Sequence, residues 1–244
     1  MRGEWALKDH LYEGTLTNVR LHKQVPMYMK RLYLEDLAEI ERVQQTVIDS
    51  LPEKNTLQPL STEEFLFILN HHGLMVGAFV EGELVAFRAL LVPEIDAEHL
   101  GRDIGLSEEE LGDMIYQEIS AVAPDYRGNR LQQKLAEVVM KELKKLEKKF
   151  RYVACTVAPM NIPSLKDKFT QQMHIAALKR KYDGLERYIL VKDLEQPNAD
   201  YGNQITAPLD DLQKQKDLLN EGYVGIGFQM VKGFHALQFA KPLR

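Results

Sequence analysis

Apolar and polar residues alternate with two different periodicities along this chain of 244 residues. Short apolar or alternating runs indicate β-strands, whereas apolar residues recurring every three or four positions predict helices with one buried face. The clearest helical stripe consists of Leu131, Leu135, Val139, Leu143, Leu146 and Phe150. Both periodicities occur throughout the chain, so the pattern predicts an α/β (α+β) fold.

The first elements expected are a strand and two helices. Residues 28–34 suit a strand because apolar and aromatic side chains dominate them. Each helix is opened by a capping pair, Asp36 with Glu39 and Ser61 with Glu64, in which an oxygen-bearing side chain precedes a glutamate by three residues. Two helices are therefore expected before the main run of strands.

Three strands are expected next, at residues 74–80, 84–92 and 116–123. A Glu-Gly turn joins the first two as a hairpin. Residues 93–113 form an acidic connection with three glycines before the third strand. A long connection of this kind fits a substrate wall or lid and fits a plain surface loop equally well.

The second half of the chain repeats the alternation of strand and helix. A strand at 152–157 precedes a short helical segment near 164–172, and two strands at 175–181 and 185–191 flank an Asp-Gly turn. These elements complete a compact α/β unit.

A tail follows this unit. Residues 195–204 are rich in Pro, Asn, Asp and Gly and indicate a linker, after which a helix at 209–220 and strands at 223–231 and 234–240 are expected. Three placements fit the pattern: the tail extends the main sheet, pairs with the amino-terminal segment, or covers a subunit surface in a homodimer.

Composition narrows the class of protein. A net charge of −5 argues against general nucleic-acid binding, which needs a cationic surface. The longest apolar stretch is shorter than the ~20 residues of a membrane helix, and the amino terminus lacks the apolar core of a secretory signal, so a cytoplasmic protein with no membrane partner is expected. The single cysteine, Cys155, lies in an apolar strand and is expected to be buried. No metal site is expected, and His71 and His72 fit a helix end.

The most informative segment is residues 118–135, EISAVAPDYRGNRLQQKL. A strand runs through a proline into an Arg-Gly turn and directly into the long helix. The start of a helix carries unpaired N–H groups and the positive end of the helix dipole, so a short loop there can bind a diphosphate. The loop contains only Gly128, whereas Arg130 and Gln132 stand where small residues would give more room.

This segment and the order of elements around it resemble the GNAT acetyltransferase superfamily. In that family a strand ends in Val-x-Pro and passes into an Arg/Gln-x-x-Gly-x-Gly/Ala turn; Val122, Pro124 and residues 127–132 stand at these positions. The resemblance covers residues 27–193 and implies a central mixed, mostly antiparallel sheet flanked by helices. Residues 1–26 would then be an amino-terminal extension, and residues 194–244 a linker with a carboxy-terminal helix and strand pair.

The resemblance implies acetyl-CoA as the co-substrate. The residues expected to hold it are Val122, Ala123, Arg127, Gly128, Asn129, Arg130, Leu131 and Gln132 in the loop, with Asn161 near the pantetheine arm. The family often has a tyrosine in the following helix that protonates the leaving thiolate. Lys168 and Phe169 stand near its place here, so a tyrosine acid is not expected.

The reaction implied is transfer of an acetyl group to a primary amine of a small molecule or a protein. Glu118 stands where the family often has a glutamate, and it is the expected general base, with a solvated strand carboxylate as the competing interpretation. Tyr116 and Ser120 share its side of the strand if alternation is regular. Two other functions remain open: a GNAT-like module that binds CoA without turnover, and a structural protein that dimerises through its tail.

Overall fold

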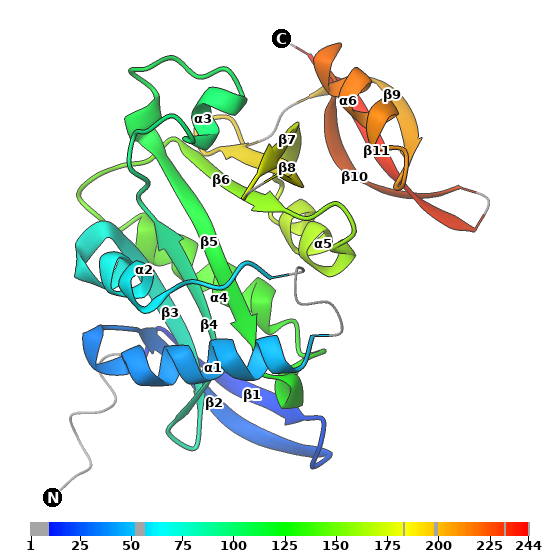
Figure 1. Ribbon diagram of the computed structural model, residues 1–244. Helices are drawn as coiled ribbons and strands as arrows, with labels where there is room; N and C mark the ends of the chain where they lie inside the picture. Colours follow the sequence, from blue (N-terminus) through cyan, green and yellow to red (C-terminus); the bar gives the residue numbers. More distant parts are fainter. Residues whose placement is uncertain (1–9, 52–56, 183, 198–199, 232, 244) are drawn as a thin grey trace, which may run out of the picture. The chain divides into compact units, whose positions relative to one another are not determined.

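The computed structural model describes residues 10–51, 57–182, 184–197, 200–231 and 233–243. The chain forms two compact units, Met1–Val92 with Gln117–Lys148 and Pro93–Tyr116 with Lys149–Arg244. Strand β5 (Met114–Val122) begins in the second unit and continues into the first (Figure 1). The mixed, mostly antiparallel sheet flanked by helices expected from the sequence is confirmed.

The first unit is built on a sheet in the order β1-β2-β3-β4-β5. Its other strands are β1 (Tyr12–Asn18), β2 (Lys23–Arg31), β3 (Gly73–Val80) and β4 (Glu83–Leu91). Successive strands from β1 to β4 pair antiparallel. Almost every side chain of β3 and β4 is buried, which is typical of strands covered on both faces.

Helices supply this cover (Figure 1). The helix α1 (Leu37–Asp49) and the short helix α2 (Thr62–Phe67), which continues as the turn η3 (Ile68–His72), pack a buried apolar cluster against the sheet. The helix α4 (Leu131–Leu143) packs on β3 and β4. Burial of these apolar stripes is the main stabilising contribution to the unit.

Several boundaries in this unit differ from the sequence prediction. The strand β1 was not expected, because its sequence, YEGTLTN, has few apolar residues. The Ser61–Glu64 capping box is confirmed, whereas Asp36 makes no cap for α1 and instead belongs to a preceding turn, η1 (Leu34–Asp36). Helix α4 ends at Leu143, so the last two apolar positions of its predicted stripe lie beyond it, where the chain turns toward the next strand.

The strands of the second unit, which includes the first residues of β5, follow the order β5-β6-β8-β7-β10-β11-β9. Its elements are β6 (Tyr152–Val157), α5 (Ile162–Thr170), β7 (His174–Lys181), β8 (Leu185–Asp193), β9 (Tyr201–Pro208), α6 (Leu212–Asn220), β10 (Val224–Val231) and β11 (Phe234–Pro242). The first residues of β5 pair with β6 in parallel, and the other strand pairs described here are antiparallel. Cys155 is buried in β6, as expected.

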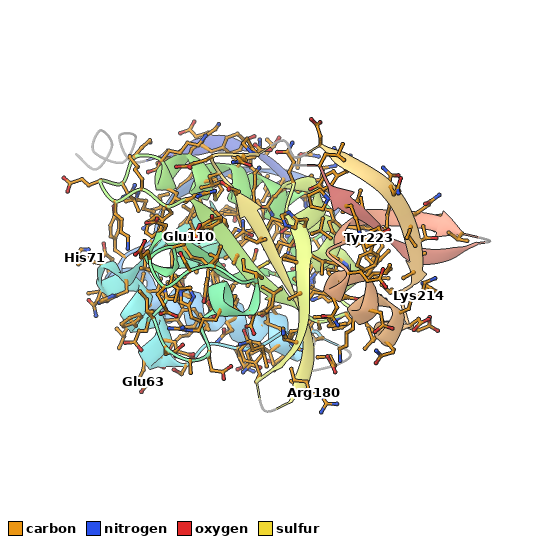
Figure 2. All side chains as sticks on the ribbon, turned by 90° about the horizontal axis from the view of Figure 1, so that it is seen from above. Glu63, His71, Glu110, Arg180, Lys214 and Tyr223 are labelled. Atoms are coloured by element: carbon orange, nitrogen blue, oxygen red, sulfur yellow. The ribbon has the colours of Figure 1, made fainter. Side chains whose placement is uncertain are left out.

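The tail extends the sheet of the second unit, since β10 pairs with β7. The predicted linker is shorter than expected, because β9 begins at Tyr201. The connection 93–113 contains a short helix, α3 (Leu100–Asp103), and a turn, η4 (Leu111–Asp113). Glu110 of this connection, labelled in Figure 2, accepts a hydrogen bond from the hydroxyl of Tyr152 (2.8 Å). In the part of the chain that the structure describes, no helix has both the length and the apolar character needed to cross a membrane.

Candidate functional site

Backbone hydrogen bonds fix the path of the chain as it leaves β5. Val122 ends the strand, and a 3-10 turn, η5 (Pro124–Tyr126), follows after one residue. The N–H of Ala123 donates to the carbonyl of Val85 in β4 (2.9 Å), which ties the loop to the neighbouring strand. The loop that follows β5 therefore begins from a rigid position.

The start of α4 carries no side-chain cap. Helices α2, α5 and α6 are each capped by a side-chain oxygen, but the N-cap of α4 is Arg130, whose side chain makes no such bond. The first helical bond runs from the N–H of Lys134 to the carbonyl of Arg130 (3.1 Å). The N–H groups of residues 131–133 precede that bond, so they face outward at the positive end of the helix, where an anion is stabilised.

Two left-handed residues shape the loop before this helix. Gly128 has a φ of 80°, and Arg130 has a φ of 54° with a ψ of 27°. A Cβ added to Gly128 would meet nothing within 4 Å, so space is open above the backbone at this position. Left-handed backbone beside a helix start favours concave groups of N–H donors that bind anions.

Asn129 fixes the loop to the first strand of the chain. Its side-chain oxygen accepts from the N–H of Thr17 in β1 (2.8 Å), and its Nδ2 donates to the carbonyl of Thr17 (2.8 Å) and to that of Tyr126 (2.9 Å). These contacts occupy both donors of the amide and one acceptor site of its oxygen. Asn129 therefore holds the loop with its side chain.

The side chain of Arg127 also points to a neighbouring element. Its Nη2 donates to the hydroxyl of Ser50, at the end of α1 (2.7 Å), and the residue is exposed. Val122 and Leu131 are buried in the core, so they can contribute only backbone groups to a ligand. The loop thus offers mainly N–H groups, with Arg130 as an exposed cation at the helix start.

A buried arginine lies behind the first turn of α4, and the sequence prediction missed it. Arg88 of β4 has no exposed surface; its Nη1 donates to the carbonyl of Gln132 (3.0 Å), and its Nη2 donates to the side chain of Gln117 (2.6 Å). A cation in this position adds positive potential to the helix start. The signal in the sequence was a charged residue inside an apolar strand, which is rare without a specific role.

The strand before the loop presents one partly exposed face. Tyr116, Glu118 and Ser120 alternate with buried neighbours along β5, as the sequence predicted. Within the described residues, the buried hydroxyl oxygen of Ser120 has no hydrogen-bond partner. An unsatisfied buried hydroxyl beside a carboxylate on the same strand face is a site where a water or a ligand can bind.

The carboxyl of Glu118 lies in an environment that disfavours its charged form. Removal from solvent raises the pKa of its carboxyl to about 7, and the negative charge of Glu64 adds to the effect. A carboxylate with a pKa near neutrality can both accept and release a proton at physiological pH, which is the property a general base needs. Perturbed pKa values of this kind gather at functional sites.

Glu64 is a second residue whose relation to the site was missed. The sequence identified it only as part of a capping box, and that box forms: its carboxylate accepts from the N–H of Ser61 (2.7 Å), and its N–H donates to Ser61 Oγ (3.2 Å). Its charge nevertheless acts on Glu118. No motif links α2 to β5, so only the folded structure reveals this pair.

The remaining predicted residues belong to the second unit. Asn161 caps α5, where its side-chain oxygen accepts from the N–H of Ser164 (3.1 Å). Lys168 is buried within α5, and Phe169 stacks edge-on against Phe228 of β10, with ring centroids 5.4 Å apart. Phe169 therefore serves packing.

Comparison with known proteins defines the class of fold. The fold is that of the GNAT N-acetyltransferases. Similar solved structures include NAA60 of Arabidopsis thaliana in complex with acetyl-CoA (TM-score 0.53, 18% identity, 69% of this chain and 99% of that one). An N-acetyltransferase from Staphylococcus aureus Mu50 matches with a TM-score of 0.52 and 16% identity over 69% of this chain and 98% of that one.

The ribosomal-protein-S18-alanine N-acetyltransferase of Escherichia coli is a third similar structure (TM-score 0.50, 19% identity, 68% of this chain and 92% of that one). No family model matches the sequence, and no curated protein matches it. At these identities the likeness establishes the fold, and function has to be argued from the site.

Proposed function

We propose that the protein is an N-acetyltransferase that moves the acetyl group of acetyl-CoA to a primary amine of a small molecule or a protein. One observation carries the proposal: the carboxyl of Glu118, whose pKa is raised to about 7, and the uncapped start of α4 belong to one strand–loop–helix segment, the first in β5 and the second directly after the loop. An anion site and a base joined in this way suit a diphosphate-bearing acyl donor and an amine acceptor.

The loop would hold acetyl-CoA by its backbone. The N–H groups of residues 128–133 would face the diphosphate, and Arg130 would add a charge, with Val122 and Ala123 supplying backbone groups toward the acyl arm. Asn161, at the start of α5, is the residue we assign to the pantetheine arm. NAA60 of Arabidopsis thaliana, which has the same fold, was solved with acetyl-CoA bound, and this supports the choice of cofactor.

Glu118 and Ser120 of β5 would then receive the proton that the amine loses. A neutral amine attacks the thioester carbonyl, the C–N bond forms, and the amine gives up a proton to Glu118, directly or through a water at the Ser120 hydroxyl. The C–S bond breaks as the carbonyl reforms, and the CoA thiolate leaves and takes a proton from solvent. A pKa of about 7 places the carboxyl of Glu118 where it can exchange a proton near neutral pH.

A CoA-binding module without turnover is the second candidate. Phe169 favours it, because a packed phenylalanine cannot protonate the thiolate. Isothermal titration with acetyl-CoA followed by a thiol-release assay over a panel of amines separates the candidates. Binding with turnover supports the enzyme, binding without turnover on any amine supports the module, and the absence of binding at millimolar ligand contradicts both.

The position of the diphosphate is tested by Gly128→Val. The side chain would project into the open space above the loop and block the approach of the diphosphate, in addition to straining a left-handed residue. Gly82→Val is the matched control, because Gly82 is also left-handed (φ 87°) with nothing near an added Cβ, but lies in the β3–β4 turn. We expect at least tenfold weaker CoA binding for Gly128→Val alone; equal affinity in the two variants would place the diphosphate elsewhere.

A further inference from the structure

Two β-α-β-β segments of the second unit repeat each other element by element. The segment β6-α5-β7-β8 precedes β9-α6-β10-β11, and both can be followed in Figure 1. The two helices have 9 residues each, the strands that follow them have 8, and the last strands have 9. We call residues 152–193 the first copy and residues 201–242 the second copy.

The copies agree in the hydrogen bonds at the start of their helices. Asn161 accepts from the N–H of Ser164 (3.1 Å), and Asp211, fifty positions later, accepts from the N–H of Lys214 (3.0 Å). Figure 2 labels Lys214 on α6. An Ala-Pro pair comes shortly before the cap in each copy, and each copy begins with a tyrosine, Tyr152 or Tyr201.

The ends of the helices agree as well. The N–H of Met173 donates to the carbonyl of Lys168 (3.1 Å), and the N–H of Tyr223 donates to the carbonyl of Leu218 (3.0 Å). The residue before each donor is left-handed, Gln172 with a φ of 63° and Gly222 with a φ of 84°. Glycine is the usual residue at a left-handed helix end, and glutamine is seldom found there. The two copies therefore share this helix end although their residues at the position differ.

The hairpins that follow carry the same irregularity. The pairing of β7 with β8 shifts between Ile175 and Ala177, and that of β10 with β11 shifts between Gly225 and Gly227, at equivalent positions. Bulges are specific features of a strand pair and not a general consequence of pairing. Cap, helix end and bulge thus repeat at one spacing, which identifies the second segment as a structural copy of the first.

The two copies meet as the halves of a symmetric dimer would. β7 pairs antiparallel with β10 through Ile175 and Gly225, which are equivalent residues of the two copies. In a twofold interface each element faces its own counterpart across the axis. The helices reciprocate: α5 packs on β10, where Phe169 stacks on Phe228, and α6 packs on β7, the strand of the first copy that corresponds to β10.

The second copy lacks the features of a second cofactor site. Asp211, an acidic residue, replaces Asn161 at the helix cap. β9 is the last strand of the sheet order, so within the described residues it has no counterpart of β5 or of the loop and helix that follow β5. The structure shows its contact with the first copy.

We propose that the second copy is a built-in partner subunit: it occupies the edge of β7 that another copy of the chain would otherwise take, and the working protein is a monomer. Gly225 is the residue that adapts β10 to the edge of β7. A Cβ at this position would lie 2.9 Å from Cδ1 and 3.0 Å from Cβ of Ile175, so a larger residue, such as the isoleucine of the first copy, does not fit opposite Ile175 at this separation. The edge therefore accepts the tail in preference to the β7 of a second chain.

The proposal is tested first by the mass of the full-length protein in light scattering coupled to size-exclusion chromatography. We expect 28.1 kDa at all concentrations up to about 100 μM, a range in which specific interfaces associate. A dimer in this range would overturn the proposal.

Gly225→Val then opens the junction within the intact chain, and Gly227→Val is the matched control, because an added Cβ at Gly227 meets nothing within 4 Å. Valine suits a strand, so only the contact with Ile175 differs between the variants. We expect amides of residues 175–178 to exchange at least tenfold faster in Gly225→Val than in the control, and its mass to rise with concentration. Equal exchange and a constant monomer mass in both variants would overturn the proposal.

Phe228→Ala covers the case in which Gly225→Val fails to fold. Phe228 is half-buried, and its truncation removes the contact with Phe169 without inserting an atom. We expect faster exchange in residues 175–178 and a mass that rises with concentration, while β11 keeps its protection. Wild-type exchange together with a wild-type monomer mass would show that the contact between the copies does not hold the edge.

Discussion

Replacing Glu118 by glutamine removes a carboxyl group whose pKa the fold raises from 4.5 to about 7. Because the neutral form is favoured in the folded chain, folded protein binds a proton between these two pH values that unfolded protein has released. The contribution of Glu118 to the stability of the wild type therefore falls as the pH rises from 4.5, and the loss is nearly complete above about pH 7. The shift corresponds to about 3 kcal/mol, and the partial exposure of Glu118 reduces our expectation to about 2 kcal/mol.

Urea unfolding at a series of pH values measures this quantity. We expect the stability of Glu118→Gln relative to wild type to increase by about 2 kcal/mol between pH 4.5 and pH 8, since the variant has no charge to bury. In the thiol-release assay, wild-type kcat/KM should rise with pH through about 7, and the variant should lose this dependence and about 10²–10⁴-fold of turnover. Parallel stability curves would refute the burial of the charge, and unchanged turnover would refute Glu118 as the base.

Glu64→Gln separates the two causes of the raised pKa. Glutamine can still complete the capping box, so α2 is preserved while the charge near Glu118 is removed. The pKa of Glu118 should then fall, and the midpoint of the activity profile should move to lower pH with turnover retained. Glu63→Gln, at the neighbouring exposed residue labelled in Figure 2, should leave the midpoint unchanged. An equal effect of both variants would mean that general charge, and not the position of Glu64, sets the pKa.

Three further substitutions test the scaffold by urea unfolding. Asn129→Ala should lower the free energy of unfolding by about 2–3 kcal/mol, because it removes three hydrogen bonds of the loop, and a wild-type midpoint would contradict that role. Gly73→Ala should cost more than about 3 kcal/mol, since its Cβ would lie 2.1 Å from the carbonyl oxygen of Leu90; a smaller loss would show that the strands can separate. Lys181→Ala should cost about 3 kcal/mol by leaving the partly buried carboxylate of Asp103 without its cation at 2.7 Å, and a neutral effect would mean that water replaces the lysine.

The sequence predicted the core of the fold because its apolar periodicity and turn residues agree with the final packing. Residues 74–80 and 84–92 form the β3–β4 hairpin almost as expected, and the Ser61–Glu64 pair opens α2. The prediction failed where contacts between distant elements determine the local structure. β1 has little apolar signal and is held by pairing with β2, and Glu39, taken as a capping residue, instead accepts from the N–H of Leu84 (2.9 Å).

The candidate site could be predicted only in part. The motif indicated the loop and Glu118, because the relevant residues are consecutive or lie on one strand. It could not indicate Arg88 or Glu64, which reach the site from other elements, nor the use of Asn129 as a tie to β1. Contacts between distant parts of the chain produce no periodic pattern in the sequence.

The tie between Asn129 and Thr17 also has a consequence for how the protein forms during synthesis. The two residues are 112 positions apart, so the loop receives its anchor from a strand that leaves the ribosome long before the loop does. Contacts of this range are slow to form, since the intervening chain must be ordered first. The geometry of the loop is therefore expected to be among the last features acquired in folding, and under the proposed function a nascent chain would bind the cofactor only after the first unit has closed.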